Sequence, residues 1–195
     1  MMKNLFMKIQ LLSHISDCVV QIGLQHGFSN FADMIDMNCG AIPEGDFENV
    51  IDPSSADQFL NLYAGIAESR FAAAVTVLLG TNSRFMPLIE DVCLEIGQEF
   101  KDENMSTAQD ALSLIDAVIL EGMAGAENRK ITLSTPEKVC WKVVNDFHAQ
   151  HWEKYSGDVK NYYHLQKCFI DGMLEGTGIK FEQNGSGEFI LWKQQ

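Results

Sequence analysis

The stretch YYHLQKCFIDGMLEGTGIKFEQNGSGEFILW, residues 162–192, has the pattern of a helix followed at once by a pair of strands. The helix is expected over residues 161–176, where Cys168, Gly172 and Gly176 recur every four positions and share one side. Glycine inside a helix costs about 1 kcal/mol relative to alanine, so something should compensate for it. We therefore predict that this side of small residues admits another backbone at close range, and that the helix is the central packing element.

The period of the apolar residues changes from helical to two after this helix. Ile179 and Phe181 alternate with polar residues, as in a half-buried strand. Asn184-Gly185 is a dipeptide that favours the tight turn of a β-hairpin. Residues 187–193 alternate again, which predicts the last strand of the fold.

Two further strands and several helices are expected before this stretch. The strands are residues 130–134, with Ile131 and Leu133 facing inward, and residues 139–144. Apolar residues at helical spacing predict helices over residues 4–26, 28–37, 54–80, 84–101 and 106–122.

This order of elements predicts the fold class. Short connections between strands favour an antiparallel sheet, so we expect an α+β fold with a helical N-terminal half followed by an antiparallel sheet packed with helices. Residues 1–80 are expected to form a helical N-terminal region and residues 84–195 an α+β domain, the two packed as one compact unit.

The charge and the cysteines limit the partners and the compartment. The 195 residues include 14 Lys and Arg against 27 Asp and Glu, a formal net charge of −13. No basic stripe is present for nucleic acid or for an anionic membrane surface. The longest apolar run, residues 71–80, is too short to span a bilayer, so no membrane insertion is expected. Five widely spaced cysteines without a C-x-x-C pair indicate reduced thiols in a cytoplasmic protein.

A polar cluster of the form D-x-H-x-x-H-x-E contains Asp146, His148, His151 and Glu153. Two imidazoles three residues apart on a helix are able to share one metal ion, with carboxylates completing the ligand set. The other interpretation is a polar face exposed to solvent, and the sequence leaves both open. His164 is a further candidate for a haem or metal ligand, against a plain surface position. No cofactor is predicted, and zinc or haem is the alternative.

Cys168 also has two interpretations. A nucleophilic cysteine needs a neighbouring base, an orienting group and access to solvent. Its position among apolar residues inside a helix favours a buried small residue instead. The sequence contains no G-x-S-x-G, phosphate-binding loop or G-x-G-x-x-G motif. The chain is therefore expected to be non-enzymatic, with no catalytic residue assigned.

Large side chains gather around the helix at residues 161–176. Small residues beside large ones leave room for a cavity lined with carbon, which suits a small hydrophobic ligand. A packed core without a cavity is the other interpretation. The residues predicted to line a pocket between this helix and the sheet are Trp141, Phe147, Trp152, Cys168, Phe169 and Met173, and the structural glycines are Gly97, Gly172 and Gly176.

Three segments of the last 110 residues match a known pattern. They are D-V-C-L-E-I-G-Q-E-F at 91–100, Y-Y-H-L-Q-K-C-F-I-D-G-M-L-E-G at 162–176 and I-K-F-E-Q-N-G-S-G-E-F-I-L-W at 179–192. Over residues 85–193 the chain resembles the vinyl-4-reductase domain family and the related small α+β subunits of TRAPP vesicle-transport particles. The positions similar to the family's Cys-aromatic-x-x-Gly-x-x-x-Gly helix are Cys168, Phe169, Gly172 and Gly176.

The resemblance implies an α+β ligand-binding domain, often dimeric, that holds small hydrophobic molecules or acts as an assembly module. Many members of the family carry zinc-binding cysteines in the closing hairpin. Residues 182–189 contain no cysteine here, and only Glu182 falls where an acidic residue is often found. This departure speaks against a zinc site of the family's kind.

Three functions are carried forward from the sequence. The first is a non-enzymatic regulatory or sensor protein that binds a small hydrophobic molecule. The second is a protein–protein assembly module, as a homodimer or as the subunit of a partner. The third is a metal- or haem-dependent protein that uses His148 and His151.

Overall fold

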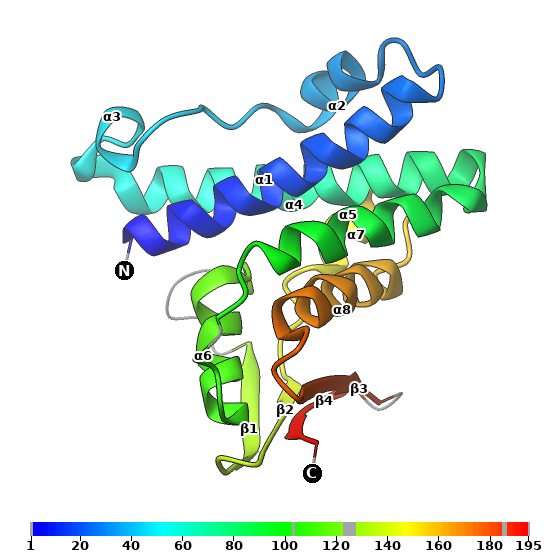
Figure 1. Cartoon of the computed structure of the whole chain (residues 1–195). Helices are drawn as coiled ribbons and strands as arrows, with labels where there is room; N and C mark the ends of the chain where they lie inside the picture. Colours follow the sequence, from blue (N-terminus) through cyan, green and yellow to red (C-terminus); the bar gives the residue numbers. More distant parts are fainter. Residues whose placement is uncertain (1, 103, 123–127, 185–186, 195) are drawn as a thin grey trace.

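Two long helices form one side of the molecule. The computed structural model describes residues 2–102, 104–122, 128–184 and 187–194. In it α1 (Met2–Gln25) and α4 (Ala56–Thr81) pack along each other. The shorter elements that connect them are α2 (Phe31–Cys39), α3 (Phe47–Val50) and the 3-10 turn η1 (Pro53–Ser55). Figure 1 shows α2 and α3 lying over this pair of helices, near opposite ends of it.

A second group of helices lies between this pair and the sheet. It contains α5 (Met86–Gln98), which follows the 3-10 turn η2 (Ser83–Phe85), and α8 (Lys160–Leu174), and these two helices pack against each other. The six-residue α7 (Ala149–Lys154) contacts α4. In Figure 1 α8 lies directly between α5 and the strands. Sequence elements far apart in the chain therefore meet at α8.

The strands form one antiparallel sheet, which confirms the predicted α+β class. The order is β1-β2-β4-β3, with α6 (Ala108–Val118) packed against β2 and β4. The bounds of the strands are β1 (Arg129–Ser134), β2 (Lys138–Val143), β3 (Ile179–Gln183) and β4 (Glu188–Lys193). Of the predicted turn between the last two strands, Gly185 lies outside the described residues, while the Asn184 N–H donates to the carbonyl of Glu188 at 2.9 Å.

The buried face of the sheet carries a stack of rings. Trp141 on β2 lies opposite Phe189 on β4, with ring centroids 5.5 Å apart and planes inclined by 10°. Phe181 on β3 stacks against both rings. Tyr163 on α8 contacts Phe189 at 5.7 Å and so joins α8 to this face. Large aromatic rings contribute heavily to burial, so this stack fixes the sheet against the helix.

The prediction that Ile131 and Leu133 face inward is wrong. They are 41% and 42% exposed, and the pairing of β1 with β2 shifts between them. β1 is also an edge strand, with a neighbour on one side only. Alternating apolar and polar residues show that a strand has two different faces, but not which face packs against the core. A register shift between two residues of a strand also interrupts the alternation of its side chains.

The predicted close approach at the small residues occurs between α5 and α8. A Cβ atom at Gly172 would lie 2.2 Å from the Leu94 carbonyl oxygen, and a Cβ at Gly97 would lie 2.1 Å from the Phe169 carbonyl oxygen. Each helix thus places a glycine against the backbone of the other. The order of these contacts also shows that the two helices run antiparallel. No side chain larger than hydrogen fits at either glycine without separating them.

Gly176 does not belong to this contact. α8 ends at Leu174, two residues earlier than the predicted helix, and Gly176 follows with φ +79°. Its role is therefore the left-handed backbone conformation that commonly ends a helix, which glycine adopts without steric cost. The third member of the predicted stripe is a turn residue and not a packing residue.

Arg70 joins the N-terminal elements to α4. Its buried guanidinium donates to the Asp17 carboxylate on α1 at 2.9 Å, forms an ion pair with Asp36 on α2, and donates to the Gly40 carbonyl at 2.8 Å. A guanidinium presents several donors in one plane, so a single side chain satisfies three acceptors. Both carboxylates are about half exposed, which leaves part of the pairing in water.

One helical stretch, Pro53–Thr81, is long and apolar enough to cross a bilayer. Within its most apolar window 61% of the residues are buried inside the protein. Its apolar side chains belong to the same hydrophobic cluster as those of α1, α5 and α8. Such burial is that of a core helix in a soluble protein.

We predict that Gly172→Ala and Gly97→Ala each destabilise the fold by about 1–3 kcal/mol or more, because the added methyl group meets a backbone carbonyl and the helices must separate. The matched control is Gly80→Ala in α4, where a Cβ meets nothing within 4 Å. This control should stabilise the protein by about 0.5–1 kcal/mol, because alanine is the better helix former. Urea unfolding followed by circular dichroism measures all three, and equal effects at Gly80 and Gly172 would contradict the close approach.

Candidate functional site

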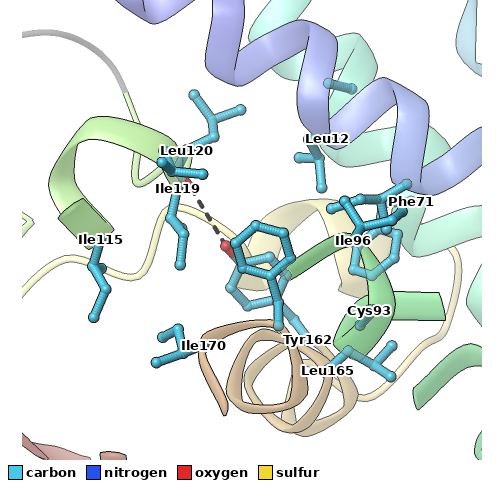
Figure 2. Packing of buried hydrophobic residues seen from close by; sticks show 14 of the residues in the cluster. Leu12, Phe71, Cys93, Ile96, Ile115, Ile119, Leu120, Tyr162, Leu165 and Ile170 are labelled. Atoms are coloured by element: carbon cyan, nitrogen blue, oxygen red, sulfur yellow. Dashed lines mark hydrogen bonds between the residues drawn. The ribbon is translucent and has the colours of Figure 1, made fainter. Parts of the chain in front are cut away.

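An apolar chamber lies where five segments of the fold meet. Its volume is about 40 Å³. The carbon-rich residues around it come from α1, α4, α5, the end of α6 with the segment after it, and α8: Leu11, Leu12, Ile15, Phe71, Cys93, Val118, Ile119, Leu120, Tyr162, Leu165 and Phe169. Lys8 and Gln166 complete the lining. Figure 2 shows Leu12 and Phe71 on one side of Tyr162 and the segment 119–120 on the other.

Tyr162 ties the wall of this chamber to α8. Its hydroxyl donates to the Leu120 carbonyl at 3.4 Å, the bond drawn as a dashed line in Figure 2. Burial raises the pKa of Tyr162 well above its ordinary value, so the hydroxyl keeps its proton and remains a donor. The segment after α6 is thus held on α8 by a buried, neutral phenol.

A polar chamber of about 20 Å³ lies on the other side of this wall. Leu120 borders the apolar chamber, while the next residue, Glu121, borders the polar one, and Gln166 borders both. The polar and charged residues that line the second chamber are Glu121, Asn128, Arg129, Asn145, His148, Tyr163 and Gln166. A volume of this size, with several polar groups around it, is enough for one water molecule.

Arg129 neutralises the acidic side of the polar chamber. Its guanidinium donates to Glu121 at 3.3 Å, forms an ion pair with Asp116, and lies 5.8 Å from the centre of the Trp141 ring. Burial raises the pKa of Glu121, and the neighbouring charge of Arg129 opposes that rise. The guanidinium of Arg129, at the border of the chamber, is therefore held between the carboxylates of Glu121 and Asp116.

The most buried ionisable pair of the described residues stands beside this chamber. Glu68, on α4, is 0% exposed and His148 is 5% exposed, and the His148 Nδ1 lies 3.0 Å from Glu68 Oε2. The imidazole stacks on the Tyr162 ring with centroids 3.6 Å apart and planes 21° apart. Neighbours on two sides thus fix the ring.

Hydrogen bonds at the start of α7 position His148 for its contact with Glu68. The Asp146 carboxylate accepts from the N–H groups of His148 and Ala149 at 2.9 and 3.0 Å, and it also accepts from the Tyr163 hydroxyl. One turn later the His151 ring bonds the Ser69 hydroxyl at 3.2 Å. Burial lowers the pKa of His151, which favours its neutral form.

The solvated polar face is therefore wrong as an interpretation of the histidine cluster. His148 is buried, and His151 is half-buried against α4. The Nδ1 atom of each ring is hydrogen-bonded to a side chain of α4, Glu68 for His148 and Ser69 for His151. In the part of the chain that the structure describes, no three His, Cys, Asp or Glu side chains are placed to hold a metal ion. Zinc or haem binding at these histidines stays a hypothesis, and His164 is exposed and bonded to Glu90.

The six residues predicted to line one pocket are distributed over different surroundings. Trp141 and Phe147 border the polar chamber, and Phe169 borders the apolar chamber. Trp152 is fully buried against Phe71, and Met173 is fully buried in the core. Cys168 is half-buried and borders neither chamber. The structure thus places three of the six at the two chambers, and whether they bind a ligand stays a prediction.

The predicted location, between α8 and the sheet, contains a groove and not an enclosed pocket. This groove is about 650 Å³ in volume and borders the end of α8, β3 and β4. It is lined by Leu94, Leu174, Ile179, Phe181 and Trp192 together with the charged Lys167, Asp171, Glu175, Lys180 and Glu182. None of the six predicted residues lines it. The many charged side chains make it a poorer match for a hydrophobic ligand than the apolar chamber is.

Several residues at the two chambers were missed by the sequence reasoning: Lys8, Glu68, Glu121, Arg129 and Gln166. One of them left a readable signal. Glu68, Ser69 and Arg70 are three consecutive polar residues in the middle of an otherwise apolar helix. Charged residues are almost never fully buried without partners, so such a run predicts partners from other elements.

We predict that Cys168 reacts slowly with iodoacetamide at neutral pH. Burial raises the pKa of its thiol to about 11, so only about one molecule in a thousand carries the thiolate at pH 8. The labelling rate, followed by peptide mass spectrometry, should rise about tenfold per pH unit from pH 7 to 9.5. The urea-unfolded chain is the control and should react much faster at pH 7. A rate that levels off below pH 9 would instead indicate an activated cysteine.

Comparisons of the chain with protein-family models, with curated proteins and with solved structures each found no match. The resemblance of residues 85–193 to the vinyl-4-reductase domain therefore stays a prediction.

Proposed function

We propose that this protein binds small amphipathic molecules, with the apolar part of the ligand in the apolar chamber. The observation that carries this proposal is a carbon-lined chamber with a half-buried lysine at its border. This agrees with the binding of a small hydrophobic molecule that the sequence suggests. A cytoplasmic location also remains part of the proposal.

The chamber has to open to receive a ligand. Its 40 Å³ is well below the roughly 150 Å³ of a cavity that holds a benzene molecule. Leu11 on α1 is half-buried, and the next residue, Leu12, is buried with 8% of its surface exposed. A narrow alkyl chain that displaces these two side chains needs the least rearrangement. Each methylene group that is buried contributes about 0.8 kcal/mol.

Lys8 indicates the other end of the ligand. Burial lowers the pKa of its ammonium group, while Asp116 and Glu121 act in the opposite direction from a distance. Among the described residues Lys8 has no ion pair and no side-chain hydrogen bond. A carboxylate bound there would supply the missing acceptor. The favoured ligand is therefore a monocarboxylic acid with an unbranched alkyl chain.

We predict that decanoate binds the protein and that Leu12→Phe weakens this binding at least tenfold, because the larger ring fills the chamber. Isothermal titration calorimetry measures the dissociation constant. The matched control is Leu62→Phe, at a leucine on α4 that is 55% exposed. Lys8→Met should lower decanoate affinity by about tenfold or more, the magnitude of a charge-assisted hydrogen bond, and leave decanol binding unchanged.

Lys142→Met, on the exposed side of β2, is the control for the charge change. If Leu12→Phe and Leu62→Phe behave alike, the apolar chamber is not the binding site. If Lys8→Met weakens the alcohol as much as the acid, the lysine does not bind the head group.

Assembly is the second candidate function, favoured by the exposed apolar side chains of β1. Ile131 and Leu133 stand on an edge strand, where a second copy of the chain would cover them. We predict self-association that Leu133→Lys abolishes, because a charged side chain resists burial. Sedimentation equilibrium of both proteins measures this, and a wild-type monomer at 100-fold different concentrations would exclude it.

A further inference from the structure

The Glu68–His148 pair is an unusual feature of the core. A carboxylate on a long apolar helix is fully buried, and its only partner among the described residues is the His148 ring. The second oxygen, Oε1, is buried without a hydrogen-bond partner in the described part of the chain. Burying a carboxylate costs free energy, and ionisable groups buried beside a cavity are frequent at catalytic sites.

The geometry leaves one nitrogen of His148 available. In the neutral tautomer whose Nδ1–H donates to the Glu68 carboxylate, Nε2 presents its lone pair. Within the described residues Nε2 has no partner. The stacked Tyr162 ring and the Glu68 carboxylate hold the imidazole in one orientation beside the polar chamber. This is the arrangement of a general base with an orienting carboxylate.

The lining of the polar chamber limits the chemistry. None of the eleven residues around it is a serine, threonine or cysteine, so the lining offers no side-chain hydroxyl or thiol nucleophile except the Tyr163 phenol. That phenol donates to Asp146, and burial and the neighbouring carboxylate raise its pKa further. The chamber has room for one water molecule. Water is therefore the nucleophile that a base at His148 would activate.

Gln166 connects the two chambers. It borders both, and its amide makes no hydrogen bond to another described residue. An acyl chain in the apolar chamber would bring its carbonyl group to this border. The amide N–H of Gln166 is then a donor for the oxygen of that carbonyl.

We propose that the two chambers form a hydrolytic site for carboxylic esters of unbranched acids, with His148 as general base. Nε2 takes a proton from water while the water oxygen bonds to the carbonyl carbon, and Gln166 donates to the resulting oxyanion. The intermediate collapses as the bond to the alcohol oxygen breaks, and His148 returns the proton to that oxygen. The products are the carboxylic acid and the alcohol. This step rests on the binding of the acyl chain proposed above, and Glu68 acts as a positioning residue through His148.

The test uses 4-nitrophenyl hexanoate with the full chain and follows the release of 4-nitrophenolate over many turnovers. This leaving group departs without a proton, so the assay reports the base role of His148 alone. His148→Gln should lower kcat at least about 100-fold, and Gln166→Leu about 100-fold. Glu68→Gln should lower kcat about tenfold or more with KM changed less than twofold, because it alters the proton acceptor and not the binding of the chain.

His164→Gln is the matched control, since His164 forms a histidine–glutamate pair with Glu90 on the exposed side of α8. It should turn over like the wild type. Decanoate binding by calorimetry and the melting temperature of each variant separate loss of catalysis from loss of folding.

The outcomes distinguish the two proposals. Decanoate binding without ester turnover, or equal turnover by the wild type and His148→Gln, overturns the hydrolytic site and leaves the binding function standing. Turnover that depends on His148 without decanoate binding supports the base role of His148 and overturns the apolar chamber as the binding site of the acyl chain. Absence of both overturns both.

Discussion

The arrangement around α8 depends on the approach of its backbone to that of α5. Gly97 and Gly172 each stand where a methyl group would lie about 2 Å from a carbonyl oxygen of the other helix. This contact fixes how deeply α8 lies in the molecule. Five of its side chains then reach the two chambers: Tyr162, Tyr163, Leu165, Gln166 and Phe169. The helix propensity lost at the two glycines, about 1 kcal/mol each, is offset by packing that no larger residue permits.

The polar run in α4 is the second organising feature. Glu68 binds His148, which precedes α7, and Ser69 binds His151 within α7, while Arg70 binds carboxylates on α1 and α2. Three adjacent residues on a helix point in different directions, about 100° apart, so each reaches a different element. If these three residues were apolar, α4 would pack with less specificity. Hydrogen bonds require one relative orientation of their partners, whereas apolar contacts do not.

Local patterns predicted much of the fold and little of the site. The strands, the central helix and the glycine contact follow from periods of two to four residues, which are local properties of the chain. The inward orientation of Ile131 failed because alternation does not identify the covered face. The Glu68–His148 pair joins residues 80 positions apart, so no spacing within α7 could reveal it. The same holds for Lys8 and Glu121, which lie 113 positions apart in the sequence.

Tyr162 lines the apolar chamber and also contacts His148, which borders the polar chamber. Its hydroxyl donates a hydrogen bond to the Leu120 carbonyl, and the face of its ring stacks on the imidazole of His148. A ligand that entered the apolar chamber beside Tyr162 would therefore contact the ring on which His148 stacks. Thermodynamic linkage would make this coupling reciprocal. A molecule bound at His148 would change the affinity of the apolar chamber for its ligand, and that ligand would change the affinity at His148 by the same factor.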